Sequence, residues 1–265
     1  MSGSLLEAAI ELAKVTGDVA LEHYRRHHRG ERLTVEVKAD GSPVSSADRS
    51  AELAARAFIE RYFPTDGVLG EELGEHRPGA PRRWCIDPID GTKSFLAGAP
   101  LWGSLVALVE GEHVLAGASY FPVTGELIAA VPGGGCVTAG VPVGASSIAD
   151  LAQAVVVTTD ERFPDAPECA GPWRELAARA RVARTWGDCF GYYLVATGRA
   201  ELMTDGKLSP WDAACFLPII EESGGVFSDW DGRRTAFGRG VIATNTPLAG
   251  ALRRALGVPE GGAPT

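Results

Sequence analysis

The chain has 265 residues, of which 45% are hydrophobic and 22% are charged, and its formal net charge at pH 7 is −9. This length and composition can bury a large core as one domain or two fused halves, and they exclude a mostly disordered chain. No cluster of Lys and Arg supplies the basic face of a nucleic-acid-binding protein, and no apolar run approaches the roughly 20 residues of a membrane span.

The cysteines point to a reducing compartment. They are scattered, odd in number and without a CxxC pair, so neither disulfides nor a structural zinc site is expected. The N-terminus also lacks the basic-then-apolar pattern of a signal peptide. These features together predict a cytoplasmic protein. The five cysteines are Cys85, Cys136, Cys169, Cys189 and Cys215.

Hydrophobic periodicity predicts mixed elements in the first half of the chain. A helix over 4–28 begins with a capping box formed by Ser4 and Glu7, and its apolar residues follow a helical stripe. A second helix is predicted over 46–62. Alternating or β-branched residues predict strands over 34–37, 68–70, 84–86 (stopped by Pro88), 105–110, 113–120 and 126–131, with a hairpin turn at 133–135.

The second half of the chain also alternates between strands and helices. The β-branched run over 154–158 is typical of a buried strand. Helices are predicted over 173–180, 191–197 and 212–222, strands over 201–204 and 241–244, and a loose tail over 259–265. Blocks of helices and strands in this order indicate packed layers of both.

The most informative segment is Asp87-Pro88-Ile89-Asp90-Gly91-Thr92. Two carboxylates with the Ile89 carbonyl between them can face one point, which is the hard-oxygen ligation that Mg²⁺ prefers. Gly91 and Thr92 begin a helical turn whose free N–H groups can receive a phosphate. Considered alone, the segment is equally well explained as an Asp-rich turn with a helix cap.

Four other acids have a simple structural explanation each. Glu71 and Glu72 follow a predicted strand, and exposed acidic pairs are usually only solvated. Asp48 matches a capping box with Ser45, and Asp212 in a first helical turn complements the helix dipole. They become informative only if one family uses them jointly.

The chain resembles the inositol monophosphatase family from about residue 5 to residue 256. Three motifs carry the resemblance: Gly70-Glu71-Glu72, the segment 84–95 (WCIDPIDGTKSF), and Trp211-Asp212-Ala213-Ala214 followed by Glu222-Ser223-Gly224-Gly225. Ser94 and Cys215 depart from the residues common in the family, and neither is a metal ligand there. The resemblance implies a layered αβαβα sandwich of α+β and α/β elements, a single catalytic domain over 1–265 with halves of about 1–145 and 146–258, and a homodimer.

The resemblance also implies a metal site. Glu71, Asp87 and the Ile89 carbonyl would bind one Mg²⁺, and Asp87, Asp90 and Asp212 a second, with two to three ions in all. An acidic protein that handles an anionic substrate needs such cations as its source of positive charge. Crowded carboxylates repel one another unless cations lie between them.

The remaining implied roles concern phosphate and water. Asp48 would help to hold a third ion, Gly91 and Thr92 would bind the phosphate, and Glu71 and Thr92 would position the attacking water. Lys38 falls close to a family lysine near the metal site. The chain has no Cys-x5-Arg loop, so direct attack by water on a phosphate monoester is expected rather than a phosphoenzyme.

A narrower resemblance runs through residues 184–201, 209–212, 218–222 and 229–232, which are similar to the histidinol-phosphate phosphatase branch of the family. That branch serves histidine biosynthesis. Asp188 and Asp205 could pair with the cationic groups of such a substrate. A carboxylate at the position of Asp205 also occurs in the inositol-specific branch, and Asp188 has an alternative explanation as a helix N-cap. We expect Trp102 and Trp186 to be core aromatics.

Three hypotheses follow. The first is a phosphatase for histidinol phosphate. The second keeps the chemistry with another small soluble ester: inositol 1-phosphate, a sugar phosphate or a 3′-phosphonucleotide. The third is a non-catalytic regulatory protein on the same scaffold, which the presence of Glu71, Asp87, Asp90 and Asp212 disfavours, since degenerate relatives are expected to lose metal-binding acids.

Overall fold

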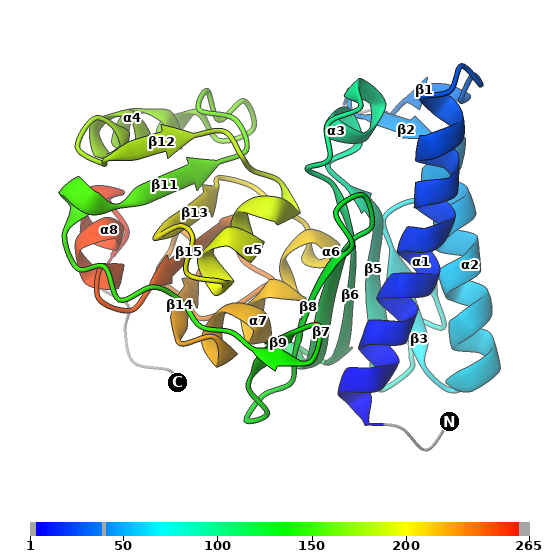
Figure 1. The fold of residues 1–265 in the computed structure, drawn as a ribbon. Coiled ribbons are helices and arrows are strands. Elements are labelled where there is room, and N and C mark those ends of the chain that lie inside the picture. The colour runs from blue at the N-terminus through cyan, green and yellow to red at the C-terminus, as the bar shows by residue number, and fades with distance from the viewer. Residues whose placement is uncertain (1–3, 39–40, 260–265) are drawn as a thin grey trace.

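The computed structural model describes residues 4–38 and 41–259, which stack in the order helices, sheet, helices, sheet, helices (Figure 1). Two long helices cover the outer face of the first sheet, three short helices lie between the sheets, and two more cover the second sheet. The αβαβα sandwich is therefore confirmed. The helices are α1 (Leu5–His27), α2 (Ser46–Tyr62), α3 (Thr92–Ala97), α4 (Ala170–Ala177), α5 (Cys189–Ala196), α6 (Pro210–Ala213), α7 (Phe216–Glu222) and α8 (Ala249–Ala255), with 3₁₀ turns η1 (Leu151–Gln153) and η2 (Pro167–Cys169).

The first sheet has the strand order β10-β9-β8-β7-β6-β5-β3-β4 within the described residues. In this described part of the sheet, only β3 and β5 pair in parallel, so their carboxyl ends meet at one edge and place Glu71 beside Asp87. A separate ribbon pairs β1 with β2 near this edge. The strands are β1 (Val35–Val37), β2 (Pro43–Ser45), β3 (Gly67–Gly70), β4 (Gly74–His76), β5 (Arg82–Asp90), β6 (Gly103–Glu110), β7 (His113–Phe121), β8 (Glu126–Ala130), β9 (Cys136–Thr138) and β10 (Val141–Pro142).

The second sheet has the order β12-β11-β13-β15-β14 within the described residues. Strand β11 is parallel to both of its neighbours, so Thr159 and Asp205 emerge at the same edge. Ligands of α/β proteins commonly bind at the carboxyl ends of parallel strands. The strands are β11 (Val155–Thr158), β12 (Val182–Arg184), β13 (Leu202–Asp205), β14 (Gly225–Ser228) and β15 (Val241–Asn245).

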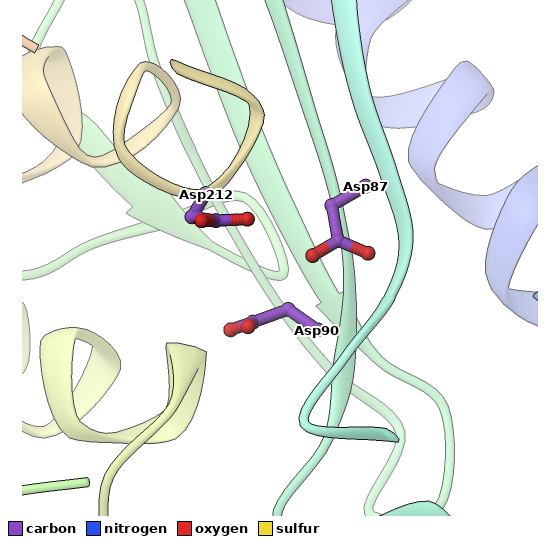
Figure 2. A group of neighbouring side chains, drawn as sticks. All are labelled: Asp87, Asp90 and Asp212. Carbon is purple, nitrogen blue, oxygen red and sulfur yellow. The ribbon is translucent and has the colours of Figure 1, made fainter. Parts of the chain in front are cut away.

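The sequence predicts that Pro88 ends its strand, and this prediction is wrong. Strand β5 continues to Asp90, and its register with β6 shifts between Asp87 and Asp90. Proline cannot donate a ladder hydrogen bond, so it is tolerated where a ladder is irregular. The irregularity turns both aspartates toward the layer of short helices (Figure 2).

The single helix predicted over 212–222 is two helices, α6 and α7. Pro218 has no N–H to donate to the carbonyl of Ala214, the residue four positions earlier. The Leu217 N–H donates to that carbonyl instead, at 3.4 Å. Donor and acceptor are three residues apart, as in a 3₁₀ turn. The break lets α6 point its first turn at the sheet edge while α7 packs against β7.

The largest apolar cluster fills the space between the two sheets and includes residues from both halves of the chain, such as Leu105 and Val157. Trp102 is fully buried, as predicted. Trp186 is not a core residue: 44% of its surface is exposed, and its ring lies 6.0 Å from the Arg184 guanidinium. The loop between β12 and α5 carries it outward.

All five cysteines lie in the described part of the chain, and all are free and buried. Among the helices of residues 4–38 and 41–259, none combines the length and the apolar character required to cross a lipid bilayer. Of the predicted tail, only Pro259 belongs to the described residues.

Candidate functional site

The site is centred on the end of β5. Asp87 and Asp90 project from the irregular end of this strand, and the Asp87 carboxylate also accepts a hydrogen bond from the Ile89 N–H at 2.9 Å. Asp212 reaches the same point from the first turn of α6 (Figure 2). One carboxylate oxygen from each of Asp87, Asp90 and Asp212 lies within 4.8 Å of the others. Two acids of one strand and a third from a distant part of the sequence therefore converge.

Asp212 also caps the helix that carries it. It closes a capping box with Ser209, whose N–H donates to Asp212 Oδ2 at 2.8 Å. The cap fixes the orientation of the side chain at the helix start. Its other oxygen is left for the carboxylate group, so capping and convergence are compatible.

The three carboxylates are electrostatically strained without a cation. Burial raises the pKa of Asp87 well above its usual value, and the charge of Glu71 raises it further. Burial and the charge of Asp188 have the same effect on the pKa of Asp90, while burial and Glu71 raise the pKa of Asp212 to about 7. Oxygens bound to one Mg²⁺ are at most about 4.2 Å apart, twice the Mg–O distance, so small side-chain rotations would suffice to hold an ion. The donor set therefore fits a hard divalent cation.

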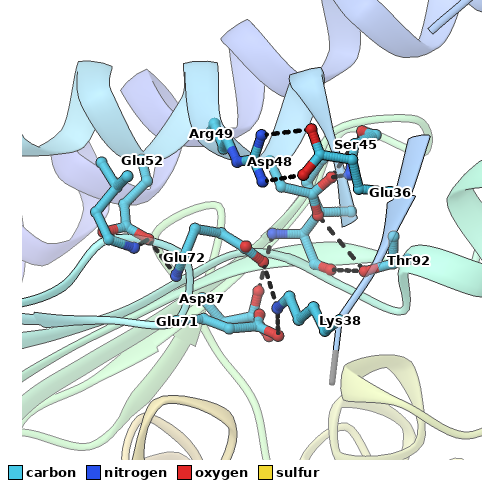
Figure 3. Close-up of polar contacts among 12 residues, drawn as sticks. Glu36, Lys38, Ser45, Asp48, Arg49, Glu52, Glu71, Glu72, Asp87 and Thr92 are labelled. Carbon is cyan, nitrogen blue, oxygen red and sulfur yellow. Dashed lines mark hydrogen bonds and ion pairs between the residues drawn. The ribbon is translucent and has the colours of Figure 1, made fainter. Parts of the chain in front are cut away.

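Glu71 lies beside this group of three and is bound to Lys38. Lys38 Nζ donates to Glu71 Oε1 and to Glu72 Oε1, both at 2.7 Å (Figure 3). Burial lowers the pKa of Lys38, but these two hydrogen bonds outweigh it and raise the pKa overall. Burial raises the pKa of Glu72 to about 7. The ammonium group thus neutralises part of the negative charge around Glu71.

Thr92 links the end of β5 to α2. Its hydroxyl donates to the Ile89 carbonyl at 3.1 Å and faces Asp48 Oδ1 at 3.5 Å. Asp48 is buried, which raises its pKa, and it also caps α2 by accepting from the Ser45 N–H at 2.8 Å. Gly91 is the N-cap of α3 with φ 89°, a conformation that favours glycine, and no side chain caps this helix.

Asp188 occupies the N-cap position of α5 but does not cap it through its side chain. Its backbone has φ 48° and ψ −153°, a region that is almost restricted to glycine and costs about 1–3 kcal/mol for other residues. The Asp188 N–H donates to Thr159 Oγ1 at 2.7 Å, and Gly187 packs so closely that an added Cβ would lie 2.2 Å from Thr159 Cα. Such strain is typically retained at functional positions.

Asp205 faces the same pocket as Asp188. The Tyr192 hydroxyl donates to Asp205 Oδ2 at 2.9 Å, and the Thr159 N–H donates to Oδ1 at 3.2 Å. Burial, followed by the charge of Asp205, raises the pKa of Asp188 to about 6. The lining of this pocket contains six aspartates and two lysines: Asp90, Asp160, Asp165, Asp188, Asp205, Asp212, Lys93 and Lys207.

Sequence reasoning assigned no role to Thr159 or Tyr192, although both orient the pocket acids. Thr159 and Asp160 directly follow the buried β-branched strand β11, so the rule for carboxyl ends of parallel strands could have found them. Tyr192 carries no comparable signal, because a tyrosine in an apolar helix reads as core.

Comparisons with known proteins identify the family of this chain. The sequence pattern of the inositol monophosphatase family matches residues 2–257. A histidinol-phosphatase of Chlorobaculum parvum is 43% identical over 257 residues, covering 96% of this chain and 97% of that protein, and one of Streptomyces coelicolor is 32% identical, covering 90% and 93%. The solved structure of an inositol monophosphatase from Zymomonas mobilis has a TM-score of 0.83 at 33% identity and covers 97% of this chain and 100% of its own. The chain therefore belongs to the inositol monophosphatase family.

Proposed function

We propose that this protein is a Mg²⁺-dependent phosphate monoester hydrolase that converts histidinol phosphate and water to histidinol and phosphate. The observation that carries the chemistry is the convergence of Asp87, Asp90 and Asp212 beside the glycine-capped start of α3. Carboxylates that raise one another's pKa in a buried site are relieved by a divalent cation. Family membership supports the same class of reaction.

Acidic side chains and one backbone carbonyl would bind the metal ions. Asp87, Asp90, Asp212, Glu71 and the Ile89 carbonyl would hold two to three Mg²⁺ ions, with Asp48 supporting the third. Bound Mg²⁺ would polarise the attacking water and neutralise charge on the leaving oxygen. Phosphoryl transfer needs mostly such positioning and charge stabilisation.

Thr92 and Gly91 complete the phosphate end of the site. The Thr92 hydroxyl donates its proton toward Ile89 O, so its oxygen can accept a hydrogen bond from the attacking water, with Glu71 as the second acceptor. The N–H groups of Gly91 and Thr92 at the start of α3 would receive the phosphate oxygens. These roles follow the family motif at these positions.

The acidic pocket favours a substrate with a cationic organic part. Histidinol phosphate carries an ammonium group and an imidazole, whereas inositol phosphate carries only hydroxyls apart from its phosphate. Asp188 and Asp205 face the pocket, and ionised acceptors strengthen hydrogen bonds to such cations. The histidinol-phosphatases among the relatives support this choice of substrate.

A substrate panel tests this proposal. Phosphate release from histidinol phosphate should have a kcat/KM far above that from inositol 1-phosphate, fructose 1,6-bisphosphate and a 3′-phosphonucleotide. Relatives named inositol-1-monophosphatase, such as that of Mesorhizobium japonicum at 31% identity, make inositol 1-phosphate the principal competitor. A preference for inositol 1-phosphate would support the second hypothesis, in which the metal-dependent hydrolysis is the same and only the substrate differs.

Replacing Asp188 should separate substrate recognition from catalysis. We expect Asp188→Ala to raise KM for histidinol phosphate by about 10- to 100-fold, because a hydrogen bond between charged groups contributes about 1.5–3 kcal/mol. KM for p-nitrophenyl phosphate, whose organic part is uncharged, should change little. Steady-state kinetics on both esters measures the difference.

Asp160 provides the matched control. It lines the same pocket, but its carboxylate is paired with the Arg162 guanidinium, which lowers the pKa of Asp160 to about 2. Asp160→Ala should therefore change KM for histidinol phosphate less than Asp188→Ala does. Equal effects of Asp188→Ala on both esters would remove Asp188 from the substrate site.

We further propose a cytoplasmic enzyme of histidine biosynthesis that acts as a homodimer, with residues 1–265 forming one catalytic domain. The central apolar cluster, which contains residues of both predicted halves, supports a single domain. The free and buried cysteines are compatible with a reducing compartment.

A further inference from the structure

A buried carboxylate lies directly beneath the turn that carries Glu71. The side chain of Glu52, on α2, is 0% exposed, and its Oε2 accepts a hydrogen bond from the Glu72 N–H at 2.8 Å (Figure 3). Both of its oxygens lie 3.3 Å from the Leu73 nitrogen. Gly70 packs against the same carboxylate, since an added Cβ would lie 2.0 Å from Glu52 Oε1.

Arg56 completes this unit one helical turn further along α2. Its Nε and Nη2 lie 2.8 and 2.7 Å from Glu52 Oε1, so the buried charge is paired. Arg56 Nη2 also donates to the Gly74 carbonyl, where the chain enters β4. The pair of Glu52 and Arg56 therefore contacts the turn at both its start and its end.

Glu71 is held on each side by these contacts. Its own N–H donates to the Ile86 carbonyl at 3.1 Å, which continues the parallel ladder of β3 and β5. The next peptide N–H, that of Glu72, leaves the ladder and bonds to Glu52. Because both flanking peptide planes are fixed, the direction in which the Glu71 side chain leaves the backbone is fixed as well, toward Lys38 and Asp87.

We infer that Glu52 is a positioning residue that holds Glu71 toward the carboxylate group of Asp87, Asp90 and Asp212, and that it thereby sets the affinity of the site for Mg²⁺. This inference rests on the proposed metal-dependent function. Groups that orient metal ligands typically change metal affinity or activity by 10- to 100-fold when they are replaced. The hydrogen bonds of Glu52 go to Arg56 and to the backbone of Glu72 and Leu73, so it would act through Glu71.

The same strand offers a matched control. Asp66 lies just before β3, at the end opposite to Glu71, and its side chain is 3% exposed and paired with Arg82 at 2.9 Å. Both pairs bury a carboxylate against an arginine, so each should stabilise the fold. Only the Glu52 pair hydrogen-bonds to the turn of Glu71 and Glu72.

The test compares Glu52→Gln with Asp66→Asn in the full chain, by calorimetric titration of the purified, metal-free protein with MgCl₂. Glu52→Gln should raise the dissociation constant for Mg²⁺ by about tenfold or more, whereas Asp66→Asn should leave it unchanged even where it lowers Tm equally. Hydrogen exchange should accelerate at residues 70–74 in Glu52→Gln alone. Glutamine keeps the size and one acceptor, so the fold should survive.

Arg56→Lys tests the same point if Glu52→Gln is insoluble. It keeps the positive charge but loses the fork that joins Glu52 to Gly74, and it should weaken Mg²⁺ binding in the same direction. Faster exchange at 70–74 with an unchanged dissociation constant would overturn the inference and leave Glu52 a purely structural residue. A wild-type protein that binds no Mg²⁺ would overturn the proposed function itself, and this inference with it.

Discussion

Asp90→Asn should lower kcat/KM for histidinol phosphate by roughly 10²- to 10⁴-fold, because a catalytic metal contributes several kcal/mol to the transition state and each 1.36 kcal/mol corresponds to a factor of ten. Asparagine keeps an oxygen that can accept the Cys189 N–H, which now bonds to Asp90 Oδ2. The fold should therefore survive while one charged ligand is lost. Steady-state phosphate release and far-UV circular dichroism measure the two effects.

The same substitution should stabilise the metal-free protein although it lowers activity. Asp90 is buried near Asp87 and Asp212; the charges of Asp90 and Asp212 add to the effect of burial on the pKa of Asp87, and the charge of Asp212 adds to it on the pKa of Asp90. Removing one charge should raise Tm in EDTA while reducing the increase in Tm that MgCl₂ produces. Asp66→Asn is the control, since it alters a buried acid outside the site. Near-normal turnover in Asp90→Asn would refute the metal centre.

Removal of metal should abolish turnover and be reversible. We expect no phosphate release after dialysis against EDTA and full recovery on addition of MgCl₂, because the pocket supplies six aspartates but only two lysines to balance a phosphate ester. Circular dichroism of the metal-free protein controls for unfolding. Turnover in EDTA would be fatal to the proposed mechanism.

The stabilisation by Mg²⁺ should also increase with pH. Asp212, whose ordinary pKa is 3.8, has a pKa of about 7 in the fold without metal. Between these values the folded protein keeps a proton that the unfolded chain releases, so the unfolding free energy of the metal-free protein falls as pH rises. Mg²⁺ binds the ionised form and offsets this loss. The difference in Tm with and without MgCl₂ should therefore grow from about pH 5 to about pH 8, as scanning fluorimetry can measure.

Local patterns predicted much of the fold. The capping boxes of Ser4 and Ser45 marked the starts of α1 and α2 correctly, since capping depends on residues three positions apart. The apolar strands β6, β7 and β11 were also predicted to within two residues. The short strands β2, β4, β9, β10, β12 and β14 were not predicted, because they are held by ladder bonds to neighbours and lack a continuous apolar alternation.

The effects of two prolines on the secondary structure were predicted wrongly from the sequence. The sequence predicts that Pro88 ends a strand, yet Pro88 lies at an irregularity of β5 where no ladder N–H is needed. The pattern predicts one helix through Pro218, yet the helix is interrupted at residues 214–215, and Pro218 lies in the first turn of α7. Whether a proline ends a strand or a helix depends on whether its missing N–H is needed for a hydrogen bond there. The order of residues along the chain does not contain that information.

Residue identity alone selected the candidates for the proposed chemistry: the segment Asp87 to Thr92, with Glu71 and Asp212, supplies the acids and the turn that we propose to bind phosphate. Their meeting in space could be read only from the three-dimensional arrangement. Parallel pairing of β3 with β5 places Glu71 beside Asp87, and the packing of α6 against β5 brings Asp212 to Asp87 and Asp90. Lys38 and Glu52 hold Glu71 beside them. The physical reason is that side-chain identity is local, whereas the convergence of charges depends on strand pairing and helix packing between distant segments.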